Sequence, residues 1–305
     1  MRRVSLVLLV VGVLCAAIAR QGPRTVNDQV MADGDRVDVC DDFALYLNHF
    51  EVRSYPSGKP RQFVSAVTVL DREAKSLEAA EIRVNSPLRR NGWWIYQFGY
   101  GPDESGVPCT QLRCVKDALL PLAAFGGALM LLGALGLCGS NGRDARSPEG
   151  PRSPARQALA WAAALVTVTV PIFIIMRAIL RPEPIPALQS PLMAPHVAAY
   201  AGSYLIMIFA AFGIGRRFAS LGFCLMTFGL VLGALWGKFC WGDYWQYDPK
   251  EMWGLATWLT YLACFSVGDR PRLKAALNVV GVILILLTAT LANFSRLFHG
   301  LHSYV

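Results

Sequence analysis

The feature that most constrains this sequence is a set of long, uninterrupted runs of apolar residues. Runs of about 17–25 apolar residues are typical of transmembrane helices, because a helix of that length crosses the hydrocarbon core of a bilayer. Only 16% of the 305 residues are charged, and 54% are hydrophobic. Seven blocks qualify as spans, and they cover residues 4–19, 118–138, 159–180, 197–214, 219–236, 252–267 and 277–294.

The first block allows two interpretations. It follows Arg2 and Arg3 and ends in "AAIAR", a pattern found in secretory signal peptides. No small-x-small cleavage site in it is followed by a plausible mature start, so we favour a retained membrane anchor over residues 1–20.

Positive charges in the loops predict which helix ends share a side of the membrane. They cluster before the first block and after the second, fourth and sixth, at Arg2, Arg3, Arg143, Arg146, Arg152, Arg156, Arg216, Arg217, Arg270, Arg272 and Lys274. All fall on one side if seven helices alternate, and the positive-inside rule makes that side cytoplasmic. The N-terminus is then cytoplasmic, whereas residues 21–117, 181–196 and 237–251 and the C-terminus are external.

The net charge of +8 does not point to nucleic acid. Nucleic-acid binding is typical of basic patches with interleaved aromatic residues, and here the arginines flank apolar blocks instead. The partner that composition predicts is membrane lipid.

Residues 40–100 have the composition of β structure. The runs "FALYLNHFEVRSY", "RQFVSAVTVLD", "AAEIRVN" and "GWWIYQFGYG" are separated by turn signals such as Pro56-Ser57-Gly58. They predict four or five short strands in a small antiparallel sheet that leans on the membrane helices or on a partner. The predicted fold class is therefore an all-α polytopic membrane protein, with about seven transmembrane helices, that carries a small external β domain.

The stretch "WGDYWQYDPKEMW", residues 241–253, places charges and rings between two apolar blocks. Part of it is a helix start: Asp248 can cap, Pro249 suits the first helical position, and Glu251 completes a capping box. Interfacial tryptophans and tyrosines are also common at membrane edges. The number of rings exceeds what anchoring needs, and a wall of rings suits a flat apolar ligand such as haem. These rings belong to Trp236, Trp241, Tyr244, Trp245, Tyr247, Trp253, Trp258 and Tyr261.

Haem iron needs axial ligands, and the chain has only four histidines. His196, His299 and His302 fall at external ends of predicted membrane helices, on the same side as the aromatic stretch. His49 falls in a predicted strand, where a solvated or structural role is expected. A lone histidine is more often a surface residue than a ligand, but this joint placement favours a pair of imidazoles around a porphyrin.

Four segments resemble a known family. "LGALWGKFCWGDYWQYDPKEMWGLATWLTY" resembles the Trp-rich WWD signature of haem-handling proteins of cytochrome c biogenesis, of the CcsA/ResC type. "LQSPLMAPHVAAYAGSYL" and "GLHSYV" resemble the segments that carry that family's two external haem-ligand histidines. "EIRVNSPLRRNGWWIYQFGYG", followed by a membrane helix, is similar to the end of the external domain of the ResB-like partner subunit.

The resemblance implies that haem b is presented at the external face and joined by thioether bonds to the Cys-x-x-Cys-His motif of apocytochrome c. The chain would then be a haem lyase, a holocytochrome-c synthase, or a core part of one. His196 and His302 would be the axial ligands, and His302 is preferred to His299 by motif. The platform would be built on Trp241, Trp245 and Asp248, with Trp236, Tyr247 and Trp253 around them.

The resemblance also implies a location and partners. The protein would be a multi-pass protein of the bacterial inner (cytoplasmic) membrane, with its site facing the periplasm. Partners would be apocytochrome c, a further biogenesis subunit and a thiol-reducing protein. No residue of the chain is expected to act as a catalytic nucleophile, because the client supplies the thiols. Two alternatives stay open: a haem-delivery module without lyase activity, and an assembly scaffold that binds no haem alone.

The predicted domain plan follows from these segments. It comprises a membrane anchor (1–20), an external ResB-like domain (21–117), a transmembrane helix (118–138), a cytoplasmic linker (139–156) and a CcsA-like membrane domain (157–305) with the WWD loop at 236–253. Two departures from the family pattern stand out. Tyr247 occupies a position where tryptophan is usual, and Ser266 occupies a position where the family often has an intramembrane histidine.

Several other side chains have two interpretations. Cys109 and Cys114 could close a short disulfide loop, which would leave Cys40 over. Cys240 is either a packed helix residue or a relay thiol, and the packed residue is favoured. Lys238 and Arg296 either meet haem propionates or anchor helices at the membrane interface.

Overall fold

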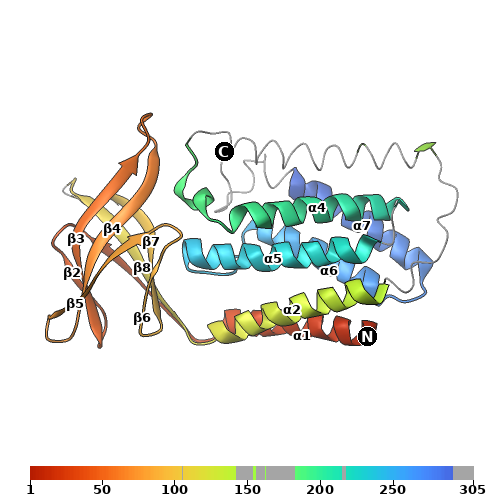
Figure 1. Ribbon diagram of the computed structural model, residues 1–305, viewed down its shortest axis with the longest axis horizontal. Coiled ribbons are helices and arrows are strands. Elements are labelled where there is room, and N and C mark those ends of the chain that lie inside the picture. Colours follow the sequence, from red (N-terminus) through yellow and green to blue (C-terminus); the bar gives the residue numbers. More distant parts are fainter. Residues whose placement is uncertain (105, 142–153, 156–161, 163–182, 215–217, 291–305) are drawn as a thin grey trace.

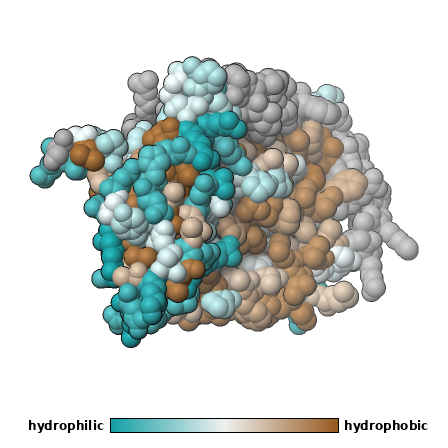
Figure 2. Space-filling view, turned by 60° about the vertical axis from the view of Figure 1, so that its left-hand side comes forward, coloured by the Kyte–Doolittle hydropathy of each residue, from teal (hydrophilic) through white to brown (hydrophobic). Residues whose placement is uncertain are grey.

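The computed structural model describes residues 1–104, 106–141, 154–155, 162, 183–214 and 218–290. A β domain stands at one end of a bundle of helices (Figure 1). On the face in Figure 2, hydrophilic residues cover the β domain and hydrophobic residues cover the helices behind it. This division is what a protein with one part in a bilayer and one part in water requires.

Six long helices lie in the described ranges. They are α1 (Arg2–Gln21), α2 (Leu120–Asn141), α4 (Met193–Ala211), α5 (Ala219–Trp241), α6 (Pro249–Ser266) and α7 (Pro271–Ala289). All except α6 are long and apolar enough to cross a membrane, which makes five candidate spans. The predicted block 159–180 lies outside the described residues apart from position 162. The prediction of a polytopic membrane protein is confirmed, and five of its seven predicted spans are found.

The predicted grouping of helix ends agrees with the arrangement. The end of α1, the start of α2, the start of α4 and the end of α5 all face the β domain (Figure 1). At the opposite end, Arg2 Nη2 donates to the carbonyl of Phe265, the penultimate residue of α6, over 2.7 Å. The positively charged N-terminus therefore lies beside the α6–α7 turn, which ends at Arg270 and is followed by Arg272 in the first turn of α7.

Helices α1 and α2 form a closely packed antiparallel pair. A Cβ at Gly12 would lie 2.6 Å from the Gly126 carbonyl oxygen, and one at Gly133 would lie 2.7 Å from the Ser5 oxygen. Backbones approach this closely only where side chains are absent, a device common between membrane helices. The first block is therefore packed as an integral part of the bundle in this structure.

The β domain has eight strands in two antiparallel sheets. Residues 40–100 contain β3 to β7, so the prediction of four or five strands there is confirmed, whereas the prediction that they form one sheet is wrong. One sheet has the order β1-β8-β7-β6 and the other β2-β3-β4-β5. The strands are β1 (Arg24–Met31), β2 (Arg36–Cys40), β3 (Phe43–Ser54), β4 (Pro60–Leu70), β5 (Ser76–Arg83), β6 (Leu88–Arg90), β7 (Trp93–Pro102) and β8 (Pro108–Asp117). The polar strands β1 and β8 pair with each other along their length, a long-range pairing that local sequence does not reveal.

The two sheets pack face to face around a single apolar core. It contains residues of both sheets: Met31, Val39, Phe43, Leu45, Leu47, Phe50, Val67, Val69, Ile82, Trp93, Ile95, Leu112 and Cys114. The expected support from the membrane part is also present. The hydroxyl of Tyr55 donates to Pro184 O over 3.1 Å, and Nδ2 of Asn85 donates to Pro186 O over 2.9 Å. The segment that leads into α4 therefore lies against the β domain.

The eight cysteines are free thiols, so the disulfide considered for Cys109 and Cys114 is absent. Both residues lie on the extended strand β8, five positions apart. That spacing separates them by about 16 Å and turns them to opposite faces. Burial raises the pKa of the core thiol of Cys114 to about 12, so it stays protonated at neutral pH.

Candidate functional site

The aromatic stretch is a short loop held between two helix termini. Helix α5 ends at Trp241, and Gly242 adopts φ +83° with its N–H donating to Lys238 O over 3.2 Å. Helix α6 begins with the predicted capping box. Asp248 Oδ1 accepts from the Lys250 N–H over 2.9 Å, and Glu251 Oε2 accepts from the N–H groups of Gln246 and Asp248. The buried Asp248 carboxylate thus fixes the helix start, which confirms the local interpretation of this residue.

His196 lies in the first turn of α4 and faces α5. Its Nδ1 donates a hydrogen bond to the Gly229 carbonyl over 2.8 Å. Its ring centroid lies 5.2 Å from that of Tyr200 and 6.0 Å from that of Trp236. With Nδ1 protonated, the lone pair of the neutral imidazole is on Nε2, which is the atom able to bind a metal.

Three glycines spaced four residues apart let His196 and the loop approach α5. A Cβ at Gly229 would lie 2.7 Å from the Tyr200 ring, and one at Gly233 would lie 2.6 Å from His196 Cε1. A Cβ at Gly237 would lie 2.9 Å from the Asp243 carbonyl oxygen. The helix surface along these glycines is therefore in van der Waals contact with α4 rings and with the loop backbone.

Two of the predicted platform rings lie with His196. Trp236 and Trp241 have centroids 5.3 Å apart at an interplanar angle of 47°. Nε1 of Trp236 donates to Ala187 O over 3.2 Å, which fixes the orientation of its indole. Cys240, only 3% exposed, packs in the same small cluster with Met193 and Trp236, which confirms it as a packed residue.

The other predicted platform residues are held differently. Tyr247 adopts φ +58°, is half exposed, and accepts a hydrogen bond from Nε2 of Gln21 on α1 over 3.1 Å. The backbone oxygen of Trp245 accepts from Nε of Arg20 over 2.8 Å. Trp253 is partly buried in the first turn of α6. The structure brings His196, Trp236 and Trp241 together and directs Tyr247 towards α1; His299, His302 and Arg296 lie outside the described residues.

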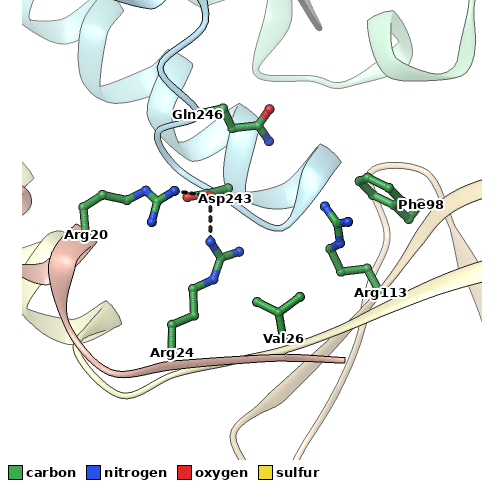
Figure 3. Close-up of a pocket in the computed structure, with 7 residues that line it drawn as sticks. All are labelled: Arg20, Arg24, Val26, Phe98, Arg113, Asp243 and Gln246. Atoms are coloured by element: carbon green, nitrogen blue, oxygen red, sulfur yellow. Dashed lines mark hydrogen bonds and ion pairs between the residues drawn. The ribbon is translucent and has the colours of Figure 1, made fainter. Parts of the chain in front are cut away.

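A cluster of charged side chains, which the sequence did not reveal, binds the loop to the end of α1 and the start of β1. Asp243 Oδ2 lies 3.0 Å from Arg20 Nη2 and 2.6 Å from Arg24 Nη1. Figure 3 shows both guanidinium groups converging on this carboxylate. The three residues line an open pocket of about 340 Å³. A signal existed in the sequence, because two arginines follow the first apolar block on the side where the positive-inside rule expects few.

Lys238 belongs to the same cluster, which the sequence did not predict. Its Nζ forms an ion pair with Asp117 and donates to Gly242 O over 3.2 Å, and the residue is only 3% exposed. Asp117 also lies 3.1 Å from Nε of Arg24. The charge of Lys238 is therefore balanced by that of Asp117 inside the protein, where β8 meets α5.

The outer face of the β1-β8-β7-β6 sheet packs on the end of α5. A Cβ at Gly242 would lie 2.9 Å from the ring of Tyr96. The guanidinium carbon of Arg89 lies 3.7 Å from the centroid of Trp94, whose ring lies 5.8 Å from that of Phe239. Burial, followed by the charge of Asp117, raises the pKa of Tyr96 far above its ordinary value, so the phenol is neutral.

Two protein families match separate parts of the chain. Residues 4–119 match the ResB-like family, and residues 212–300 match the family described as cytochrome C assembly protein. The chain therefore joins a part that is similar to the ResB-like family to a part that is similar to cytochrome c assembly proteins. This confirms the resemblance drawn from the motifs and extends its ResB-like portion towards the N-terminus.

Individual relatives match a segment of comparable length. The cytochrome c biogenesis protein CcsA of Porphyra purpurea is 43% identical over 98 residues, which cover 30% of this chain and 29% of the relative. The protein of the same description from Gloeobacter violaceus is 41% identical over 95 residues, covering 30% and 28%. The chain therefore spans less than a third of the length of these curated relatives.

The charged cluster contains residues of both matched parts of the chain. Arg20, Arg24 and Asp117 lie in the ResB-like part, whereas Lys238 and Asp243 lie in the cytochrome c assembly part. The ion pairs Arg24–Asp243 and Lys238–Asp117 therefore join the two parts at the aromatic loop.

Proposed function

We propose that this protein binds haem b at the external face of a bacterial cytoplasmic membrane and presents it for thioether attachment to apocytochrome c. The observation that carries the proposal is the setting of His196. Its Nδ1–H donates a hydrogen bond to the Gly229 carbonyl, which selects the tautomer whose lone pair is on Nε2. This arrangement is common for metal-binding histidines. The indole of Trp236 lies beside the His196 ring, and the indole of Trp241 lies beside Trp236. The chain also matches the cytochrome C assembly protein family in one part and the ResB-like family in another.

The residues fit the chemistry of haem. An imidazole with a fixed ring orientation suits an axial ligand, and indoles suit the flat apolar faces of a porphyrin. His302, matched by motif, would be the second ligand. When bound, haem supplies vinyl groups to which the two thiols of the client add.

The role of the chain in this proposal is positioning. His196 and His302 would hold the iron, and the rings of the loop would hold the plane of the porphyrin with one edge towards the client. Holding two reactants in a fixed mutual geometry is itself a large contribution to rate. No side chain of this protein has to donate a nucleophile, because the cysteines of apocytochrome c provide it.

The test is the absorption spectrum of the purified protein beside two ligand variants. We expect His196→Ala and His302→Ala each to lose the spectrum of six-coordinate bis-histidine haem. His49→Ala is the matched control and should keep it, because His49 pairs with Asp33 on the β domain surface over 2.7 Å. Retention of the bis-histidine spectrum by both ligand variants would refute the assignment.

Co-expression with an apocytochrome c separates lyase activity from haem delivery. Covalent cytochrome that appears with the wild-type chain and disappears with His196→Ala supports a haem lyase. Full histidine ligation without attached cytochrome supports a delivery module. A purified protein without a Soret band supports an assembly scaffold.

The platform can be tested at Trp245. We expect Trp245→Ala to lower haem occupancy roughly threefold to tenfold, the loss that corresponds to one stacked ring. Trp245→Phe keeps a ring and should retain most of the occupancy. Equal occupancy in all three proteins, measured by pyridine haemochrome assay, would argue against stacking on Trp245.

A further inference from the structure

We propose that Arg24, together with Arg20, positions the aromatic loop, so that the ResB-like part sets the geometry of the haem site. This inference rests on the proposed function. It assigns to two arginines outside the cytochrome c assembly match a role in holding that site.

Arg20 and Arg24 share one carboxylate, that of Asp243. Arg20 Nη2 and Arg24 Nη1 both lie within 3.0 Å of Asp243 Oδ2. Asp243 is two residues after Trp241 and two residues before Trp245. A shift of its backbone therefore moves both indoles.

The same two arginines also bind the backbone of the loop. Arg24 Nη2 donates to Gly242 O over 3.0 Å, and Arg20 Nε donates to Trp245 O over 2.8 Å. The carbonyl groups at the C-terminus of a helix carry partial negative charge, which a cation stabilises. The arginines thus hold the chain on both sides of Asp243 as well as its side chain.

The charged side chains of this cluster are largely buried. The side chains of Arg20, Arg24, Asp117 and Asp243 are 24%, 19%, 12% and 12% exposed, and that of Lys238 is 4% exposed. Ion pairs removed from water are weakly screened by salt and are costly to break one at a time. The cluster is therefore a stable attachment rather than a pair of surface charges.

The same end of α1 holds the loop at two more points. The hydroxyl of Tyr244 donates to Ala16 O over 3.2 Å, and Gln21 Nε2 donates to the hydroxyl of Tyr247 over 3.1 Å. Burial and nearby carboxylates raise the pKa of Tyr244 to about 12, so its hydroxyl keeps the proton that it donates. The loop is thus bound by the last turns of α1 and the start of β1.

The experiment compares Arg24→Gln with Arg113→Gln. Arg113 lines the same pocket (Figure 3) and pairs with Asp28 through two bonds of 2.6 and 2.7 Å, but both partners belong to the β domain. Arg24→Gln should raise hydrogen–deuterium exchange of the loop amides 242–248 about tenfold, because the loop loses the bonds from Arg24 to Asp243 and to Gly242 O. Arg113→Gln should leave that exchange unchanged.

A second readout concerns the haem itself. Arg24→Gln should lower haem occupancy about tenfold, within the range seen for partners that orient metal ligands, and shift the reduction potential of the haem that is retained. Arg113→Gln should change neither. Arg20→Lys keeps the charge but cannot reach Asp243 and Trp245 O together, so it should show a smaller effect in the same direction.

The outcomes are distinguishable. Equal loop exchange in Arg24→Gln and wild type overturns the inference, whether or not the wild-type protein binds haem. Faster exchange without haem in the wild-type protein supports positioning of the loop and refutes the proposed function. If Arg24→Gln does not fold, Arg20→Lys decides, and wild-type exchange and occupancy in that variant overturn the inference.

Discussion

Gly233→Ala is expected to displace the His196 ring and to lower haem occupancy about tenfold, as loss of an orienting partner does. The added Cβ would lie 2.6 Å from Cε1 and 2.9 Å from Nδ1 of the imidazole. The ring cannot yield without stretching its 2.8 Å hydrogen bond to Gly229 O. Overpacking of this kind typically costs about 1–3 kcal/mol, and here it falls on the proposed ligand. The measurement is the Soret spectrum together with haem content per polypeptide.

The matched control is Gly202→Ala on α4, where a Cβ would make only an ordinary 3.6 Å contact with Leu225. This variant should bind haem as the wild-type chain does. A double variant sharpens the test, because effects that act through the same residue are not additive. In a His196→Ala background, Gly233→Ala should cause no further loss, and an additional tenfold loss would show that Gly233 acts elsewhere.

Asp117→Ala is expected to be among the most destabilising single substitutions in the junction. It removes the carboxylate that pairs with Lys238, whose side chain is 4% exposed, and with Nε of Arg24. Leaving a buried charge unpaired costs about 3–5 kcal/mol. For a chain of this size, the midpoint of thermal unfolding should fall by roughly 6–20 °C, and scanning the detergent-solubilised protein measures it.

Asp28→Ala is the control for that result. Asp28 also forms an aspartate–arginine pair, but its side chain is 52% exposed. Exposed ion pairs contribute about 0–1 kcal/mol, so the midpoint should move by only a few degrees. A small shift for both variants would mean that the Asp117–Lys238 pair is not the strong attachment inferred here.

Local sequence patterns predicted the parts of this protein that depend on neighbours along the chain. The apolar blocks located all five candidate spans, because crossing a bilayer requires a continuous run of apolar residues. The capping box at Asp248 and Glu251 was predicted because its hydrogen bonds join residues within one helical turn. The Trp-rich signature identified the cytochrome c assembly part for the same reason.

The extent of the β domain was not predictable in the same way. Strands β1 and β8 are rich in polar residues and are separated by most of the domain. Their edges become buried only when they pair, from Arg24 opposite Asp117 to Met31 opposite Thr110. A strand of this kind looks like a linker until its partner is known.

The candidate site shows the same limit. The sequence by itself determined that this chain is a polytopic membrane protein with a β domain, and which residues carry the motif of cytochrome c assembly proteins. Only the tertiary structure decided that Gly233 makes room for His196, and that Arg24 meets Asp243 across 219 positions of sequence. Periodicity, capping and composition are set by near neighbours. The partner of a buried charge or the residue facing a glycine depends on how segments far apart in the sequence pack together, and that packing exists only in the folded chain.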